Sequence, residues 1–232
     1  MSKSKPKVSI VKSKYANLYS VANALSAIGV EAQITDDRKE ILSADSLICP
    51  GVGSFSQVKS YFDSHKLTDS ISEFINTSKP FLGICVGMQI LFEKGYEGKQ
   101  PTKGLAFFEG EVVSLPPNKV SRIPHIGWNT LSFKPLNNKK ALFNSFNESA
   151  EDVYFVHSFY CSAKNKKDIL ASAQLAENFE IPAIIGKNNI YGMQFHPERS
   201  GKVGLQLLKA FVSLSSEHSE NPSQNIKEFK ID

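Results

Sequence analysis

Cys85 stands in a sequence pattern that is typical of a catalytic nucleophile. An apolar segment, residues 80–84, leads into the letters GICVG at 83–87, and a helix is expected over 86–94. Glycines two positions before and after the cysteine remove the Cβ atoms that would clash in a sharp strand-to-helix turn. The amino end of that helix favours a thiolate, and the N–H of Val86 is placed to receive an oxyanion. The pattern predicts thiolate attack on a carbonyl carbon, with a buried structural cysteine as the alternative.

A thiol nucleophile needs a base, and His196 is the best placed of the five histidines. It ends an apolar strand, and Glu198 follows two residues later. Residues i and i+2 of an extended chain point to the same side, so the carboxylate can orient the imidazole. The sequence thus predicts a Cys–His–Glu set, against the alternative of a strand-end histidine beside a surface glutamate. His157 is the rival base, but neither it nor His125 has an acid two residues away, and both are expected to line a pocket or to pack.

A second anion donor is expected in the letters PGVG at 50–53. Glycines on both sides of Val52 allow a backbone N–H to turn outward and donate to an anion. The segment matches neither of the phosphate motifs GxGxxG and GxxxxGK[ST]. It follows an apolar strand, residues 46–49, so it would lie at the carboxyl end of a strand near the nucleophile. We therefore expect an oxyanion donor here, with a plain turn as the alternative.

The composition is that of an ordinary globular protein in a reducing compartment. The 232 residues carry 27 lysines and arginines against 23 acidic residues, and no apolar run is long enough for a membrane helix. Most of the cations are scattered lysines, which indicates a solvated surface rather than a nucleic-acid interface. Three cysteines without a CxxC pair exclude a disulfide framework and the usual zinc pattern, and they favour a cytoplasmic protein. Cys49 and Cys161 lack flanking glycines and are expected to be structural.

The elements that would position these residues alternate in the first hundred residues. Apolar spacing predicts strands over 8–11, 30–35, 46–49 and 80–84, and helices over 17–29, 54–64, 68–78 and 86–94. This alternation is typical of a parallel sheet wrapped by helices.

The second half of the chain changes character. It predicts strands over 104–115, 123–133, 152–161, 169–175, 183–187 and 190–196, and a closing helix over 201–214. We therefore expect one α/β domain over residues 1–216. It would have a mixed, mainly parallel central sheet flanked by helices, with an antiparallel strand extension. Residues 217–232 are expected to form a polar C-terminal tail.

Five segments together resemble the class I glutamine amidotransferases, over a span from about residue 8 to residue 214. They are PGVGSF at 50–55, GICVGMQILFE at 83–93, PHIGWN at 124–129, YFVHS at 154–158 and GMQFHPERS at 192–200. GxCxGxQ with HPE is specific to that superfamily. The pair PGVGSF and PHIGWN is similar to the glutaminase subunits of imidazole glycerol phosphate synthases, and is not expected in anthranilate, GMP or carbamoyl-phosphate relatives.

The resemblance implies a glutaminase that needs neither a metal nor a cofactor. Cys85 would be the nucleophile, His196 the base and Glu198 the residue that orients the base. The N–H of Val86 and the Val52–Gly53 peptide would hold the oxyanion.

The resemblance also implies a set of substrate-binding residues. Gln89 and Glu97 fall where the family grips substrate glutamine, and His157 with Ser158 lies along the same site. One departure is Phe159, because many members carry a tyrosine at this position and its hydroxyl contact is lost here.

The family resemblance further implies a heterodimer with a barrel cyclase. That partner makes imidazole glycerol phosphate and an aminoimidazole carboxamide ribotide with the ammonia it receives. Trp128 and Arg199 fall where the family meets the cyclase, with Arg199 in place of the usual lysine. Trp128 is the only tryptophan, and packing in the core is the alternative for it.

Three other interpretations remain open at the level of sequence. Residues 12–18 read KSKYANL where the family usually reads DYGxGNL, which fits a paralogue that feeds ammonia to a surface-sugar amidotransferase. A stand-alone cysteine hydrolase would need neither Gln89 nor the PHIGWN segment. An inactive scaffold would have no need for an intact Cys85, His196 and Glu198.

Overall fold

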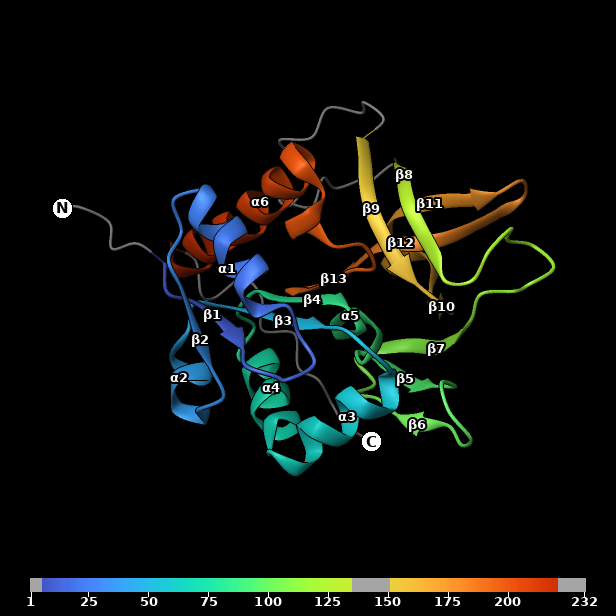
Figure 1. Ribbon diagram of the computed structural model, residues 1–232. Helices are drawn as coiled ribbons and strands as arrows, with labels where there is room; N and C mark the ends of the chain where they lie inside the picture. Colours follow the sequence, from blue (N-terminus) through green and yellow to red (C-terminus); the bar gives the residue numbers. More distant parts are fainter. Residues whose placement is uncertain (1–5, 135–150, 221–232) are drawn as a thin grey trace.

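The computed structural model describes residues 6–134 and 151–220, with side chains described up to residue 215 (Figure 1). A large mixed sheet has the strand order β2-β1-β3-β4-β13-β12-β11-β8-β9, and a smaller sheet has the order β10-β7-β5-β6. The predicted α/β class, with a parallel sheet flanked by helices and an antiparallel extension, is confirmed. Within these residues, no helix is long and apolar enough to cross a membrane.

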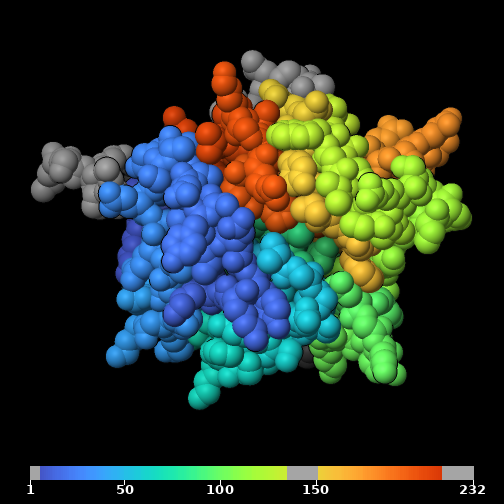
Figure 2. Space-filling model, in the orientation of Figure 1, coloured from blue at the N-terminus to red at the C-terminus, as the bar shows by residue number. Residues whose placement is uncertain are grey.

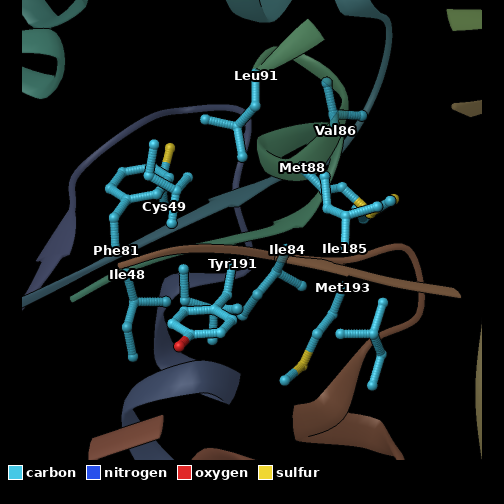
Figure 3. Packing of buried hydrophobic residues seen from close by; sticks show 14 of the residues in the cluster. Ile48, Cys49, Phe81, Ile84, Val86, Met88, Leu91, Ile185, Tyr191 and Met193 are labelled. Carbon is cyan, nitrogen blue, oxygen red and sulfur yellow. The ribbon is translucent and has the colours of Figure 1, made fainter. Parts of the chain in front are cut away.

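The first five strands in the order of the large sheet run parallel and form its buried part. They are β1 (Val8–Val11), β2 (Ala32–Thr35), β3 (Ser46–Gly51), β4 (Phe81–Cys85) and β13 (Ile190–Met193). Every residue of β1, β3, β4 and β13 is buried, as continuous apolar runs between two helical layers predict. Figure 3 shows Ile48, Ile84, Tyr191 and Met193 together on one face of these strands.

Helices cover both faces of the parallel strands (Figure 1). One layer contains α1 (Leu18–Ala27) and α6 (Gly201–Glu220), which pack against each other. The other contains α2 (Arg38–Ser43), α3 (Phe55–Ser64) and α4 (Leu67–Asn76). The short helix α2 was not predicted, and α6 continues past the predicted end at residue 214. Residues 221–232 of the predicted polar tail lie outside the described residues.

The antiparallel extension adds four strands beyond β13. They are β12 (Phe179–Lys187), β11 (Ile169–Ala176), β8 (His125–Phe133) and β9 (Glu151–His157), with the 3₁₀ turn η2 (Lys166–Asp168) before β11. The last two strands pair so that His125 lies opposite His157, and Trp128 opposite Tyr154. This ladder therefore places most of the PHIGWN and YFVHS segments on one two-stranded ribbon.

The smaller sheet corrects two predictions. Its strands are β5 (Phe92–Gly95), β6 (Thr102–Lys103), β7 (Phe108–Ser114) and β10 (Phe159–Ala163). The helix predicted over 86–94 is wrong beyond its first turn, α5 (Val86–Gln89), because the chain enters β5, where Phe92 stacks on Phe108 at 5.7 Å. The strand predicted over 152–161 is two strands: the chain leaves the large sheet after β9 and joins the smaller sheet as β10.

Three backbone segments meet without side chains between them where β4 turns into α5. A Cβ atom on Gly83 would clash with the carbonyl oxygen of Gly87, and one on Gly87 would clash with the carbonyl oxygen of Cys49. Strand β3 also runs on through Pro50 and Gly51, where a break was expected, and Gly51 pairs with Cys85. The glycine pattern around Cys85 is therefore a requirement of close backbone approach.

We expect Gly87→Ala to lower the free energy of unfolding by about 3 kcal/mol or more, because the added methyl group meets main-chain atoms that no side-chain rotation can move. Chemical denaturation monitored by circular dichroism measures the change. Gly127→Ala is the matched control, since a Cβ at Gly127 meets nothing within 4 Å. Equal stability of the two variants would contradict this account of the junction.

Candidate active site

The nucleophile candidate lies on a strained backbone at the end of β4. Cys85 has φ 54° and ψ −112°, a conformation that residues with a Cβ rarely adopt and that costs on the order of 1–3 kcal/mol. The residue is 5% exposed and lines a cavity of about 250 Å³. The next residue, Val86, begins α5 and lines the same cavity. The strain holds the sulfur at the cavity instead of in the core.

His196 and Glu198 come together as predicted. His196 Nδ1 lies 2.8 Å from Glu198 Oε1, and the two side chains are 7% and 2% exposed. Pro197 and Glu198 belong to the 3₁₀ turn η3 (Pro197–Arg199), which follows His196 directly. Burial alone would lower the pKa of His196, but hydrogen bonds to Cys85 and Glu198 raise it to about 10. Both hydrogen bonds therefore favour the protonated imidazole.

The cavity gathers almost all of the predicted site residues. Its lining includes Val52, Gly53, Cys85, Val86, Gln89, Glu97, His157, Ser158 and His196. Glu198 lies behind His196, as an orienting residue should. Substrate could therefore reach the sulfur, the imidazole and the polar side chains from one space.

The predicted oxyanion donors at 52–53 are only partly available in this conformation. The N–H of Val52 donates to the carbonyl oxygen of Tyr15 at 2.7 Å, so it cannot bind an oxyanion at the same time. Gly53, whose N–H belongs to the following peptide, lines the cavity and adopts φ 91°. The KSKYANL segment, which departs from the family pattern, thus contacts the predicted oxyanion loop directly.

Glu97 brings a half-buried carboxylate to the cavity from the loop after β5. Its Oε2 accepts a hydrogen bond from the N–H of Phe55 at 2.7 Å. Burial raises the pKa of Glu97, and this hydrogen bond opposes the rise. A carboxylate at the cavity wall suits a ligand that carries an ammonium group.

His157, the rival base, is a neutral side chain. Burial, opposed by a hydrogen bond to the Phe159 carbonyl, lowers the pKa of His157 to about 4. Its Nδ1 lies 2.9 Å from that carbonyl oxygen and must donate to it, so Nε2 carries the lone pair. Nε2 is buried without a partner in the described parts of the chain. Unlike His196, this imidazole has no carboxylate partner among the described residues, as the sequence indicates.

Gln194 is a site residue that the sequence analysis missed. It is fully buried, and its Nε2 lies 3.8 Å from Cys85 Sγ. Gln89, predicted to bind substrate, donates from Nε2 to the Phe159 carbonyl at 3.0 Å and to Gln194 Oε1 at 3.2 Å. The available signal was a polar residue inside an otherwise apolar strand end, two positions before His196.

The two residues predicted to face a partner lie on one surface. Trp128 is 56% exposed, which excludes the alternative of a core tryptophan. Its ring meets the edge of the Tyr154 ring at 5.8 Å, and Arg199 lies 4.8 Å above the same ring. Figure 2 shows this region, where the yellow-green surface of β8 and β9 adjoins the orange-red surface of residues near 200.

Comparison with known protein families assigns the chain to a class that fits its strained cysteine, its His–Glu pair and its α/β sheet. The glutamine amidotransferase class-I family model matches residues 10–213, and the chain belongs to this family. The curated relatives narrow the resemblance to one kind of member, imidazole glycerol phosphate synthase subunit HisH. The protein of that name from Caldanaerobacter subterraneus subsp. tengcongensis is 44% identical, over 88% of this chain and 96% of its own length. The one from Lactococcus lactis is 40% identical, over 89% and 98%.

Solved structures of distant relatives support the fold. PurLQS from Thermotoga maritima superposes with a TM-score of 0.69 at 20% identity, covering 90% of this chain and 98% of that one. A glutamine amidotransferase from the same organism gives 0.55 at 15% identity, covering 95% and 87%. The predicted family and the predicted fold class are thus confirmed.

The depressed pKa of His157 predicts an acid-labile contribution to stability. The unfolded chain binds a proton at this residue near pH 6.5 and the folded chain only near pH 4. The free energy of unfolding should therefore fall by about 2 kcal/mol between pH 7.5 and pH 5 through this group alone. His157→Gln, which can still donate to the Phe159 carbonyl, should lack that part of the loss in urea unfolding curves. Parallel pH profiles for the two proteins would show that His157 is not held neutral.

Proposed function

We propose that this chain is the glutaminase subunit of an imidazole glycerol phosphate synthase and passes ammonia to a barrel cyclase partner. The observation that carries the proposal is the Cys85–His196–Glu198 constellation at one cavity. The identity of 36–44% to HisH subunits over most of the chain supports the histidine-pathway partner. Three free thiols fit a cytoplasmic enzyme.

The first half-reaction releases ammonia. The Cys85 thiolate attacks the carboxamide carbon of glutamine, and the carbonyl oxygen becomes an oxyanion. The N–H groups of Val86 and Gly53 are the proposed donors to it, and one such donor is worth about 2.7–4 kcal/mol in comparable hydrolases. The His196 cation gives its proton to the leaving nitrogen, the C–N bond breaks, and a glutamyl thioester and ammonia result.

The second half-reaction releases glutamate. His196, now neutral, takes a proton from water as the oxygen attacks the thioester carbon. The C–S bond then breaks, and the His196 cation and the Cys85 thiolate form again. Glu198 keeps the imidazole in place and stabilises its charge in both halves.

The substrate-binding proposal assigns polar atoms of the cavity to the two ends of glutamine. The Glu97 carboxylate suits the α-ammonium group, and His157 Nε2 and Gln89 Oε1 are acceptors for N–H groups of the substrate. Ser158 lies along the same wall.

The stand-alone hydrolase and the surface-sugar paralogue have weaker support. The exposed Trp128 on an aromatic and cationic surface favours a protein partner over a stand-alone enzyme. The similarity to HisH subunits favours the cyclase over a surface-sugar partner.

We expect Cys85→Ser to lower glutaminase turnover by more than about 10⁴-fold without unfolding the chain, because a hydroxyl is far less nucleophilic than a thiolate. Glutamate release in the presence of the cyclase measures the loss, and circular dichroism checks the fold. Cys161→Ser, at a buried position outside the cavity lining, is the matched control and should keep most of the activity. Undiminished turnover in Cys85→Ser would refute the proposed function.

Trp128→Ala should weaken binding to the cyclase by at least about 30-fold, the effect of losing one aromatic hot spot. Titration calorimetry with the purified cyclase measures the dissociation constant. The isolated variant should keep the unfolding midpoint of the parent chain, because more than half of the indole surface is exposed. An unchanged dissociation constant would remove Trp128 from the interface.

A further inference from the structure

Cys85 Sγ has a second polar neighbour besides His196. We infer that Gln194 donates a hydrogen bond to the Cys85 thiolate, and that Gln89 holds Gln194 in the donating orientation. Gln194 is then a further catalytic residue and Gln89 a positioning residue for it. The catalytic role of Gln194 rests on the proposed glutaminase function, whereas the hydrogen bond itself does not.

The orientation of both amides follows from one main-chain carbonyl. The Phe159 oxygen can only accept, so the Gln89 atom that lies 3.0 Å from it is Nε2. The same nitrogen lies 3.2 Å from the Gln194 side chain, which must therefore turn its Oε1 toward it. Gln194 Nε2 is left to face Cys85 Sγ at 3.8 Å. Turning either amide over would bring two donors or two acceptors together.

Burial makes this chain of hydrogen bonds costly to break. Gln194 is fully buried and Gln89 is 2% exposed, so water is a poor substitute for the partners they have. Among the described side chains, Cys85 Sγ is the hydrogen-bond acceptor found for Gln194 Nε2. A thiolate is a much better acceptor than a thiol, so the contact favours the charged sulfur.

The Phe159 carbonyl also fixes the second histidine of the cavity. It accepts from His157 Nδ1 at 2.9 Å as well as from Gln89 Nε2, and a carbonyl oxygen has two lone pairs for this purpose. One backbone atom therefore sets the tautomer of His157 and the direction of both glutamines. The loss of the family tyrosine at Phe159 leaves this role intact, because it belongs to the main chain.

The donor also acts on the geometry of attack. Cys85 Sγ accepts hydrogen bonds from both His196 and Gln194. These two donors restrict rotation about the χ1 torsion of Cys85. A hydrogen-bonded thiolate is a somewhat weaker nucleophile, but nucleophilicity falls by less than half of the gain in thiolate fraction on a logarithmic scale. The net effect at neutral pH is a faster attack.

Alkylation of the full chain by iodoacetamide tests the inference without glutamine. Cys85 modification is followed by peptide mass spectrometry at pH 7 and pH 9.5 in the parent chain, Gln194→Met, Gln194→Glu, Gln89→Met and the double variant Q89M/Q194M. Gln206→Met, at an exposed position on α6, is the matched control. Urea unfolding of each variant checks that it folds. Cys49 and Cys161 are fully buried and serve as internal unreactive thiols.

We expect Gln194→Met to slow alkylation at pH 7 by about threefold to tenfold, because one hydrogen bond to a charged group changes the thiolate fraction by about tenfold or more and the freed thiolate regains part of its nucleophilicity. The deficit should close or reverse at pH 9.5, where hydroxide supplies the thiolate in both proteins. Gln194→Glu should be slower still, because a carboxylate replaces the donor. Gln89→Met should show a smaller deficit, and the double variant should match Gln194→Met, because Gln89 acts through Gln194.

A Gln194→Met rate equal to that of the parent, or a deficit of the same size at both pH values, would overturn the inference. If Gln194→Met does not fold, Gln194→Glu and Gln89→Met decide, and parent rates in both would overturn it. These outcomes do not depend on the substrate. Glutamate release by the parent chain with the cyclase tests the proposed function separately, so failure of one is distinguishable from failure of the other.

Discussion

The contact between the first turn of α5 and the end of β3 is the constraint on which the site depends. Gly87 lies against the Cys49 carbonyl, and Gly83 lies against the Gly87 carbonyl, so the two segments touch through main-chain atoms alone. This approach forces the chain to reverse within one residue, and Cys85 takes the positive φ that the reversal requires. The ladder between β3 and β4 pairs Gly51 with Cys85, the residue directly before α5. The close approach of the two backbones therefore accompanies the place of Cys85 at the cavity wall.

The two histidines of the cavity have opposite pKa shifts because their neighbours differ. His196 has a buried carboxylate on one side and the sulfur on the other, and hydrogen bonds to both raise its pKa. His157 has a main-chain carbonyl and no carboxylate, and burial keeps it neutral. The first can give a proton to a leaving nitrogen, whereas the second offers the cavity an acceptor, Nε2, because its Nδ1 donates to the Phe159 carbonyl. This difference between the two histidines is visible in the sequence, because a glutamate stands two residues after His196 and a phenylalanine two residues after His157.

Local signals were enough to predict the parallel core and most of the residues that meet at the cavity. Continuous apolar strands, the glycines around Cys85 and the HPE letters each encode their structure within a few residues. The failures have a common origin in tertiary contacts. Residues 90–94 look helical, but the chain enters the second sheet at β5, where Phe92 stacks on Phe108. The hydrogen bond between Val52 and Tyr15, and that between Gln194 and Cys85, join segments distant in sequence.

The surface around Trp128 is physically close to the base through Tyr154. The Tyr154 ring lies between Trp128 and Arg199, while its carbonyl oxygen accepts the backbone N–H of His196 at 3.0 Å. Three residues along the same β8–β9 ladder, His157 faces the cavity opposite His125. In the proposed complex, a partner bound at Trp128 would contact the ring of a residue whose carbonyl oxygen holds the main chain of the base. Tyr154 therefore links the proposed partner surface to the base within one residue.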